Sequence, residues 1–573
     1  MSEILQNGSA PRLPRQVADA YVDALIALDP ITGTYLGVAA SSTKLPDFSP
    51  AGRAAVAELA RDTLARLEAA EALPGAEADA ERRCARLLRE RLTAELAVHE
   101  ADEHLCAVSN IHGPAHEVRE VFTLTPSDTE EDWAAIAERL RAVPAAFAGY
   151  RESLGLGLER GLYGGPRATT TMIGQLGAWA GETGGTGEGG EGGAFFQEFV
   201  SAGPDALRAE LDAAAAGATA AVVELRDWLS AVYAPAVQDK PDTVGRERYA
   251  RWSRYFNGTD LDLDEAYAYG WAEYHRLLAE MKTEAAKILP GVGPWEALKH
   301  LDEHGTHIEG VDEVQAWLQG LMDEAIENLD GTHFELAERV RKVESRIAPP
   351  GGPAAPYYSS PSEDFSRPGR TWLPTMGQTR FPVYDLVSTW YHEGVPGHHL
   401  QLAQWTHVAD QLSRYQATVG WVSANCEGWA LYAERLMDEL GYLKDAEQRL
   451  GYLDCQMMRA ARVIVDIGMH VGLRIPDDSP FHPGENWTVD LAQEFFGLHS
   501  GRPADFIESE LTRYLSMPGQ AIGYKLGERA WLLGRENARA AHGESFDLKA
   551  WHMAALSQGS LGLDDLVDEL SKL

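Results

Sequence analysis

Apolar side chains recur at helical spacing along most of the chain, with polar residues between them. The segments that share this pattern in the first half are residues 16–30, 51–108, 128–154, 195–237 and 263–288. Ala, Leu, Glu and Arg dominate these segments, and helix breakers inside them are few. A period near 3.6 residues and this composition predict a series of long helices.

The second half of the chain continues the pattern with one interruption. Helices are predicted over residues 423–440 and 446–473 and from about 520 onward. Residues 349–374 are too rich in Pro, Gly and Ser for a helix, yet too aromatic for a disordered linker. We therefore expect a mainly α-helical, large multi-helix body with a small β element near 355–380.

One low-complexity segment, rich in glycine, interrupts the helical pattern of the first half. Residues 181–193 read GETGGTGEGGEGG and lack the lysine and preceding strand of a phosphate-binding loop, so we expect a flexible surface loop. We expect an N-terminal helical region over residues 1–240, which carries this loop. A second helical region over 241–573 would hold the catalytic residues.

The net charge limits the classes of binding partner, and the cysteine content indicates the redox compartment. The chain has 50 Lys and Arg against 87 Asp and Glu, a formal charge of −37, which argues against nucleic acid and anionic membranes as partners. The four cysteines, Cys84, Cys106, Cys426 and Cys455, form no C-x-x-C pair and predict reduced thiols. Met1–Arg15 has no apolar core and no long apolar run follows, so a cytoplasmic location is expected.

The strongest chemical signal is the stretch HEGVPGHH at residues 392–399. In the usual H-E-x-x-H zinc helix, two histidines four residues apart reach one metal from the same face. Here the position four after His392 is Pro396, which cannot bind a metal and disfavours a regular helix. Glu393 directly follows the first histidine, which is the position of the general base in that motif.

Either of two histidines could complete such a site. His398 lies about 120° from His392 on an ideal helix, and a local distortion between Gly394 and Gly397 would bring the two together. His399 is nearly in phase with His392, but about 10 Å along the axis. We therefore favour His398 as the second ligand and expect His399 to contact substrate or a carboxylate such as Glu434.

Two acids on a downstream helix supply the rest of a metal site. Glu427 and Glu434 are seven residues apart, so both lie on one helix face with Ala430 and Leu431 between them. Two acids on an apolar face are costly unless they are paired. Glu427 is the candidate third ligand, and Glu434 could hold a histidine ligand from behind. The alternative is an acid pair in solvent.

A polar stripe on the next helix is a second candidate set. Arg459, Arg462, Asp466 and His470 are spaced by three, four and four residues between apolar neighbours. They form either a surface stripe or an inward network facing the metal site. In the second case Asp466 would orient a catalytic His470, and the two arginines would bind a substrate carboxylate or the acids of the site.

Two weaker patterns complete the candidates. The stretch RYLSMPGQAIGY at residues 513–524 offers Tyr514 and Tyr524 as donors to an oxyanion, and Arg513 and Gln520 as substrate contacts. The stretch HLDEH at residues 300–304 matches an inverted zinc motif, but Gly305 and a polar context favour a helix end.

Several of these stretches together resemble a known family. HEGVPGHHLQ, EGWALYAE, RAARVIVDIGMH and RYLSMPGQAIGYK are similar to motifs of the bacterial domain-of-unknown-function 885 family, and YYSSPSEDFSRPGRTW resembles its approach segment. That family is regarded as akin to gluzincin metallopeptidases, including the thimet-oligopeptidase-like and carboxypeptidase-Taq groups. The resemblance implies a helical fold with a deep cleft and zincin-like metal-site helices. It also implies His392, His398 and Glu427 as ligands of one Zn²⁺ ion.

These signals predict a zinc-dependent hydrolase of peptide or amide bonds. A zinc-activated water would attack the carbonyl, with Glu393 as the general base. The partner would be a small peptide or a small molecule that contains an amide, and the sequence does not indicate an oligomeric state. Two alternatives remain: a metal-dependent non-peptidase enzyme of a biosynthetic pathway, such as a lyase or small-amide hydrolase, and a catalytically silent helical binding protein.

Overall fold

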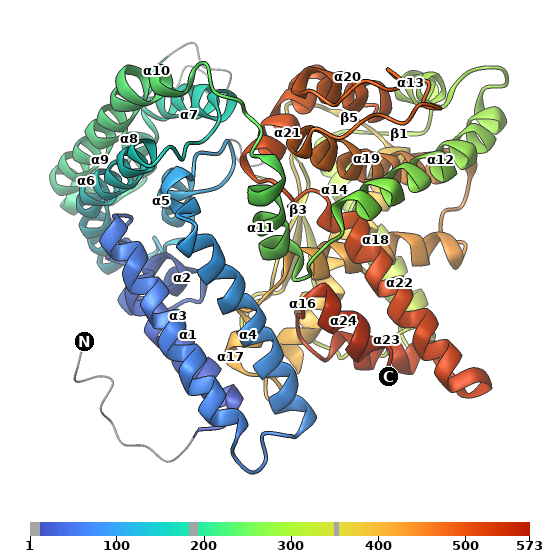
Figure 1. Cartoon of the computed structure of the whole chain (residues 1–573), viewed down its shortest axis with the longest axis horizontal. Coiled ribbons are helices and arrows are strands. Elements are labelled where there is room, and N and C mark those ends of the chain that lie inside the picture. Colours follow the sequence, from blue (N-terminus) through green and yellow to red (C-terminus); the bar gives the residue numbers. More distant parts are fainter. Residues whose placement is uncertain (1–11, 183–192, 349–354) are drawn as a thin grey trace. The chain divides into compact units, whose positions relative to one another are not determined.

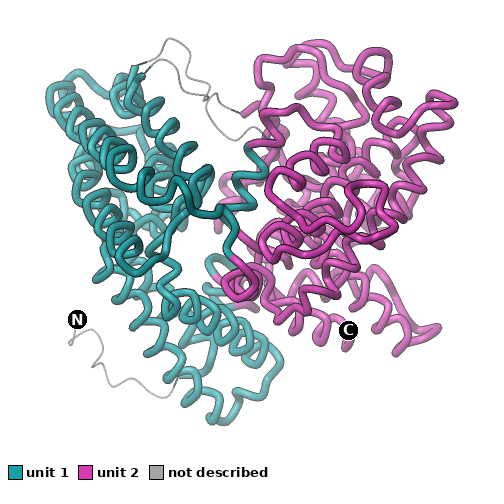
Figure 2. Tube along the Cα trace, turned by 45° about the horizontal axis from the view of Figure 1, so that its top comes forward, with its two compact units in different colours: residues 1–244, 413–419, 509–517 teal, residues 245–412, 420–508, 518–573 magenta. Residues whose placement is uncertain are grey.

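The computed structural model describes residues 12–182, 193–348 and 355–573, and these residues divide into two compact units. Figure 2 colours the two units. Unit 1 comprises residues 1–244, 413–419 and 509–517, and unit 2 comprises residues 245–412, 420–508 and 518–573. The predicted division at 240/241 lies close to the first of these boundaries but omits the two short segments. Nearly all of the predicted glycine-rich loop lies outside the described residues.

The described residues of unit 1 form helices and the loops between them, and no strands (Figure 1). Its α-helices are α1 (Pro14–Leu28), α2 (Pro30–Tyr35), α3 (Pro50–Glu71), α4 (Asp79–Glu100), α5 (Pro114–Leu124), α6 (Glu130–Glu159), α7 (Pro166–Trp179), α8 (Phe195–Val200), α9 (Arg208–Trp228), α10 (Ala234–Val237) and α17 (Arg414–Ala417). Shorter turns are η1 (Ala39–Ser41), η2 (Glu103–Cys106), η3 (Asp205–Leu207) and the π-type turn η4 (Leu229–Tyr233).

Several helices of unit 1 begin where the local sequence provides a start signal. Proline occupies the first helical position of α1, α3 and α5, where its missing N–H is not needed. At the start of α6, Thr129 and Asp132 exchange side-chain to backbone hydrogen bonds in a capping box. The predicted helices over 51–108 and 128–154 are therefore present with shifted ends.

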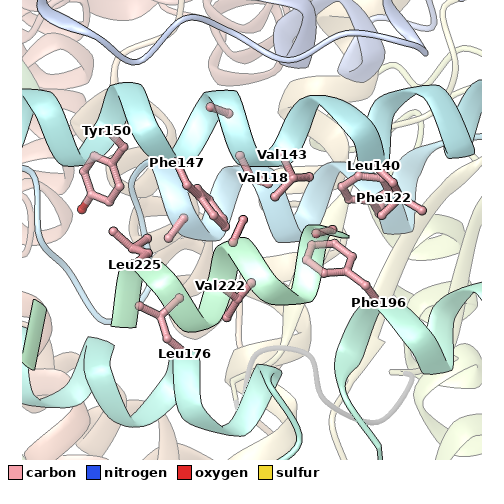
Figure 3. Close-up of a cluster of buried hydrophobic side chains, with 14 of the residues drawn as sticks. Val118, Phe122, Leu140, Val143, Phe147, Tyr150, Leu176, Phe196, Val222 and Leu225 are labelled. Atoms are coloured by element: carbon pink, nitrogen blue, oxygen red, sulfur yellow. The ribbon is translucent and has the colours of Figure 1, made fainter. Parts of the chain in front are cut away.

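The core of unit 1 lies where α6 packs along α9, with α5, α7 and α8 around them (Figure 3). Phe147 and Tyr150 of α6 face Val222 and Leu225 of α9, and all four side chains are buried. Contiguous apolar burial of this extent is what stabilises a helical unit, since helix propensity alone contributes little.

The two later segments belong to unit 1 through specific contacts. The backbone N–H of Arg414 donates to Asp19 of α1 at 2.7 Å, and Tyr415 packs edge-on against Tyr21. The amide of Asn110 donates to the carbonyl of Ser509 at 3.0 Å. Helix α21 (Ala504–Ser516) therefore starts in unit 2 and ends in unit 1.

Unit 2 contains the remaining helices (Figure 1). They are α11 (Gly245–Asn257), α12 (Leu263–Ile288), α13 (Pro294–His304), α14 (Val311–Leu329), α15 (Val383–Glu393), α16 (His398–His407), α18 (Ser423–Glu439), α19 (Ala446–Val471), α20 (Val489–His499), α22 (Gly523–His542), α23 (Leu548–Leu556) and α24 (Leu563–Leu570), with the short turn η5 (Gly543–Ser545).

Two small sheets lead into α15. Strand β4 (Gly369–Leu373) lies between β2 (Val343–Ile347), which runs parallel to it, and β3 (Tyr357–Ser359), which runs antiparallel. A separate antiparallel pair joins β1 (His307–Glu309) to β5 (Arg380–Pro382). The expected β element near 355–380 is thus confirmed and is extended by β1 and β2.

The centre of unit 2 is built on α19, which packs along α12 and α15, and on α18, which packs along α22. The second pair approaches very closely, because Gly428 of α18 and Gly527 of α22 face each other. A Cβ on Gly428 would overlap the backbone of Gly527, and a Cβ on Gly527 would overlap the carbonyl oxygen of Ala424. The absence of side chains here lets α22 lie directly against the part of α18 that carries Glu427.

The mainly α-helical fold class is confirmed, and the deep cleft stays a prediction. Among the described residues, no helix is both long and apolar enough to cross a membrane.

Candidate metal centre

The histidine motif does not form one helix. Helix α15 ends at Glu393 and α16 begins at His398, so residues 394–397 separate two helices. The N–H of Gly397 donates to the carbonyl of Tyr391 at 3.0 Å. A Cβ at Gly397 would overlap the carbonyl oxygens of Tyr391 and His392, so only glycine fits this approach. The sequence predicted a distortion at this place, and the structure has a complete break.

The break brings three side chains from three helices to one place. Oε2 of Glu427 in α18 lies 3.4 Å from Nε2 of His392 and 3.6 Å from Nε2 of His398. The two imidazole rings are 4.8 Å apart and nearly perpendicular. One nitrogen or oxygen from each side chain lies within 4.8 Å of the others, and no other cluster of three metal-binding side chains occurs among the described residues.

This donor set fits zinc. Two imidazoles and one carboxylate are a common protein ligand set for catalytic zinc, and bonds of about 2.0–2.1 Å in a tetrahedral site place neighbouring ligand atoms about 3.3–3.4 Å apart. Within the described residues, neither Oε2 of Glu427 nor Nδ1 of His398 has a hydrogen-bond partner, although both are buried. A buried carboxylate oxygen without a hydrogen-bond partner is uncommon, and coordination to a metal ion would satisfy Oε2 of Glu427.

The three groups influence one another's protonation. Burial acts to raise the pKa of Glu427, but the facing imidazoles of His392 and His398 outweigh it and hold the pKa well below its usual range. Burial acts to lower the pKa of His392, whereas Glu427 and Glu434 raise it to about 9. The site is therefore an anionic carboxylate placed to receive positive charge.

Glu434 supports His392 from the side away from Glu427. Nδ1–H of His392 donates to Oε1 of Glu434 at 2.7 Å, which directs Nε2 toward the centre of the site. The hydroxyl of Ser388 donates to Oε2 of the same carboxylate at 2.7 Å. The contact that the seven-residue spacing predicted for Glu434 is present.

Glu393 is buried beside the two histidines at the end of α15. Burial raises the pKa of its carboxyl above the usual value, and the positive character of His392 and His398 acts in the opposite direction. A carboxyl with a raised pKa accepts and returns a proton nearer to neutral pH, as a general base must.

His399 has a different environment from the one predicted. Its ring is 0% exposed. Nε2–H donates to the carbonyl of Val340 at 2.7 Å, and the hydroxyl of Tyr358 lies 3.0 Å from Nδ1, which accepts from it. Burial lowers the pKa of His399 to about 4. The expectation that His399 contacts substrate or Glu434 is wrong, because both nitrogens are already bonded inside the fold.

The stripe on α19 points inward, as one of the two sequence interpretations proposed. All four side chains are buried. Arg459 donates to the carbonyl of Cys455 at 3.0 Å and lies 3.8 Å from Glu434, so it accompanies an acid of the site. Asp466 lies 3.8 Å from Nε2 of His470. A direct catalytic part for His470 stays a prediction.

The arginine at position 462 is associated with a tyrosine near the site. Its guanidinium carbon lies 4.7 Å from the ring centre of Tyr524. The ring of Tyr524 is stacked on that of His392 with 6.5 Å between their centres. The amide of Gln520 donates to the hydroxyl of Ser423 at 3.3 Å, at the start of the helix that carries Glu427. Tyr524 of unit 2 therefore contacts a member of the triad.

Arg513 and Tyr514 lie in the part of α21 that belongs to unit 1. Tyr514 donates to Oε2 of Glu510 at 2.6 Å, and the guanidinium of Arg513 pairs with the same carboxylate at 2.8 Å. Their parts in catalysis and substrate binding stay predictions. His300 and His304 have rings 4.7 Å apart, and His304 is the last residue of α13, as its glycine neighbour predicted.

Sequence reasoning missed three residues of the buried hydrogen-bond network that contains Glu434. Ser388 stands four residues before His392, so helical spacing alone could have found it. Gln456 of α19 contacts Glu434, and Lys525 of α22 contacts Gln456, but no local pattern in the sequence indicates either contact.

The chain is similar to a bacterial protein family and to two solved structures over nearly its whole length. A family model described as "Bacterial protein of unknown function (DUF885)" matches residues 30–570. No curated protein matches the chain. A solved structure named as a putative lipoprotein from Colwellia psychrerythraea is 22% identical and superposes with a TM-score of 0.78, covering 97% of this chain and 98% of that one. A putative lipoprotein of unknown function from Shewanella oneidensis is 18% identical with a TM-score of 0.73, covering 98% of this chain and 100% of that one. The chain therefore shares its overall fold with both of these structures.

Proposed function

This chain belongs to the DUF885 family of bacterial proteins, and from that premise we propose that it is a zinc-dependent hydrolase of peptide or amide bonds, akin to the gluzincin metallopeptidases. The family description names no activity, so the proposal rests on the chemistry of the site. The observation that carries it is the convergence of His392, His398 and Glu427 from three helices, with the buried Oε2 of Glu427 lacking a hydrogen-bond partner.

Each residue has a definite part in this proposal. Nε2 of His392, a ring nitrogen of His398 and Oε2 of Glu427 would hold one Zn²⁺ ion. When bound, zinc supplies Lewis acidity, which polarises a carbonyl and lowers the pKa of a water molecule to about 7. Glu393 takes a proton from the attacking water and delivers it to the nitrogen of the leaving amine. The oxygen of that water joins the carbonyl carbon as the C–N bond breaks.

The surrounding residues would bind and orient the substrate. Tyr524 beside His392 is a candidate hydrogen-bond donor to the developing oxyanion, and Arg462, stacked on Tyr524, is a candidate partner for a substrate carboxylate. Gln520, which also belongs to unit 2, is a further candidate. The proposed substrate is a small peptide or another small molecule with an amide bond.

Metal analysis and one substitution test the proposal. Protein purified without added metal should contain close to one equivalent of zinc, and less than about a tenth of an equivalent would count heavily against it. The Glu393→Gln variant should keep its zinc and lose at least about a hundredfold in kcat, since the base alone is removed. A variant with full activity would exclude Glu393 as the base.

A substrate screen separates the proposal from the alternative chemistry. A peptide library and a panel of small amides, including biosynthetic intermediates, would be compared at the same enzyme concentration. Turnover of small metabolites without cleavage of any peptide would assign the site to a non-peptidase. Zinc binding without turnover of either set would favour a silent binding protein.

We also propose that the protein works in the cytoplasm. Its four cysteines are buried and no disulfide joins them, which suits a reducing compartment. The two similar structures bear titles that call each a "putative lipoprotein", so cell fractionation is the direct test. Recovery of the native protein in the membrane fraction would overturn this proposal.

A further inference from the structure

A series of buried polar groups continues from the metal site into the interior of unit 2. Oε1 of Glu434 holds Nδ1 of His392 at 2.7 Å, and Oε2 of Glu434 accepts from Nε2 of Gln456 at 3.4 Å. Oε1 of Gln456 in turn accepts from Nζ of Lys525 at 2.6 Å. Glu434 and Gln456 are each 1% exposed, and Lys525 is 0% exposed.

The ammonium group of Lys525 is balanced by acids on its other side. Nζ donates to Oε2 of Glu528 at 2.6 Å and lies 3.2 Å from Oε2 of Glu273. Glu528 also accepts from Arg435 at 3.2 Å, and Glu273 pairs with Arg276 at 2.8 Å. This arrangement fixes Lys525 in place, because a buried ammonium that lost these partners would be strongly destabilising.

The chemistry of lysine fixes the orientation of the Gln456 amide. An ammonium group has three donors and no acceptor, so the side of the amide that faces Lys525 must be the carbonyl oxygen. The NH₂ group then faces Glu434 and donates to it. With the amide turned around, its oxygen would oppose the carboxylate of Glu434, and the support behind His392 would be weakened.

We propose that Lys525 is a positioning residue for the metal site, which acts through Gln456 and Glu434 to set the orientation of the His392 ligand. This inference rests on the proposed function, since it concerns the affinity of the same site for zinc. Groups behind a metal-binding histidine fix its tautomer and ring direction, and their loss typically lowers metal affinity about 10–100-fold.

A purely structural explanation makes a different prediction. If Lys525 only neutralised Glu528 and Glu273, its loss would reduce the stability of the fold and leave the zinc affinity of the folded protein unchanged. The dissociation constant for zinc, measured on folded protein, therefore distinguishes the two explanations. A double-mutant cycle with Glu434 adds a second test, because residues that act through one another are not additive.

The experiment titrates the metal-free full-length protein with Zn²⁺ against a chromophoric chelator. We expect Lys525→Met and Gln456→Leu each to weaken zinc binding about tenfold, with circular dichroism like that of the wild type. The matched control is Glu273→Gln, which removes the charge of one of the two acid partners of Lys525 and leaves Gln456 in place, and its zinc affinity should be unchanged. In the Glu434→Gln background, Lys525→Met should cause no further loss.

The outcomes are separable. If the wild type binds no zinc, the proposed function fails. If the wild type binds zinc and folded Lys525→Met binds it equally well, the positioning role is wrong and the proposed function stands. If Lys525→Met does not fold, Gln456→Leu decides, and wild-type affinity in that variant overturns the inference. An additive loss in the Glu434→Gln background would also contradict it.

Discussion

At the scale of single residues, two adjacent histidines have opposite surroundings. His398 faces Glu427 and carries a buried nitrogen without a hydrogen-bond partner, whereas both nitrogens of His399 are bonded within the fold. We expect His398→Ala to lose zinc as completely as His392→Ala. His399→Ala should keep zinc and lower the free energy of unfolding by about 1–3 kcal/mol, since it leaves a buried carbonyl without its donor.

Zinc content by mass spectrometry and urea unfolding of each variant check this pair of expectations. Loss of the metal from His399→Ala alone would show that the ligand assignment is reversed.

A buried acid of α19 that is not a candidate ligand should make stability depend on pH. Burial raises the pKa of Asp454 to about 7, and Arg502 only partly opposes this. Between about pH 4 and pH 7 the folded protein keeps a proton that the unfolded chain has released, so stability falls as pH rises through this window. The loss is on the order of 4 kcal/mol and is fully present above pH 7.

Asp454→Asn should remove this component. The variant and the wild type should unfold at similar urea concentrations near pH 4, and the variant should be the more stable of the two at pH 8. An equal difference at both pH values would show that Asp454 does not titrate in this range.

What the sequence could predict at this scale follows from helical spacing. Glu434 was predicted because it lies seven residues after Glu427 on one helix. Gln456, Lys525 and the partners of His399 could not be predicted, because these contacts join residues from different helices, a strand and a turn. Single-sequence patterns contain the period of each element, but not the pairing between elements.

At the scale of elements, the break between α15 and α16 determines the site. Gly397→Ala should push the two helices apart, because the new methyl group would overlap two carbonyl oxygens, and zinc affinity should fall by at least about tenfold. Gly320→Ala in α14 is the matched control, since a Cβ there meets no atom within 4 Å. It should stabilise the protein by about 0.5–1 kcal/mol.

Zinc titration and thermal unfolding of the two alanine variants provide the check. Equal zinc affinity in Gly397→Ala would mean that the backbone can relax around the methyl group without moving His398.

Helix positions were largely predictable from apolar periodicity, and α12 covers the predicted residues 263–288. The exact form of the break was not predictable. Pro396 and Gly397 indicate that a regular helix is disfavoured, but whether the chain bends, bulges or stops depends on which backbone groups around it accept the free N–H groups.

At the scale of the whole molecule, zinc should stabilise one unit selectively. A ligand that binds only the folded site stabilises it by RT ln(1 + [L]/Kd), about 2.7 kcal/mol at one hundred times Kd. All three candidate ligands belong to unit 2. Hydrogen exchange should therefore slow in α15, α16 and α18 when zinc is added, and stay unchanged in α6 and α9 of unit 1.

Peptide-resolved exchange with and without chelator measures this difference. Equal slowing in both units would indicate that they open together rather than separately.

The two short segments that return to unit 1 affect when this unit can fold during synthesis. Unit 1 needs residues 413–419 and 509–517, so on the ribosome it stays incomplete until residue 517 of 573 has emerged. In the usual order an N-terminal domain folds first and alone, once all of its residues have emerged. Unit 1 cannot follow this order, because its last two segments emerge after most of unit 2. A release at residue 244 would yield a fragment that lacks the last two segments of unit 1, and such nascent chains should engage chaperones until residue 517 has emerged.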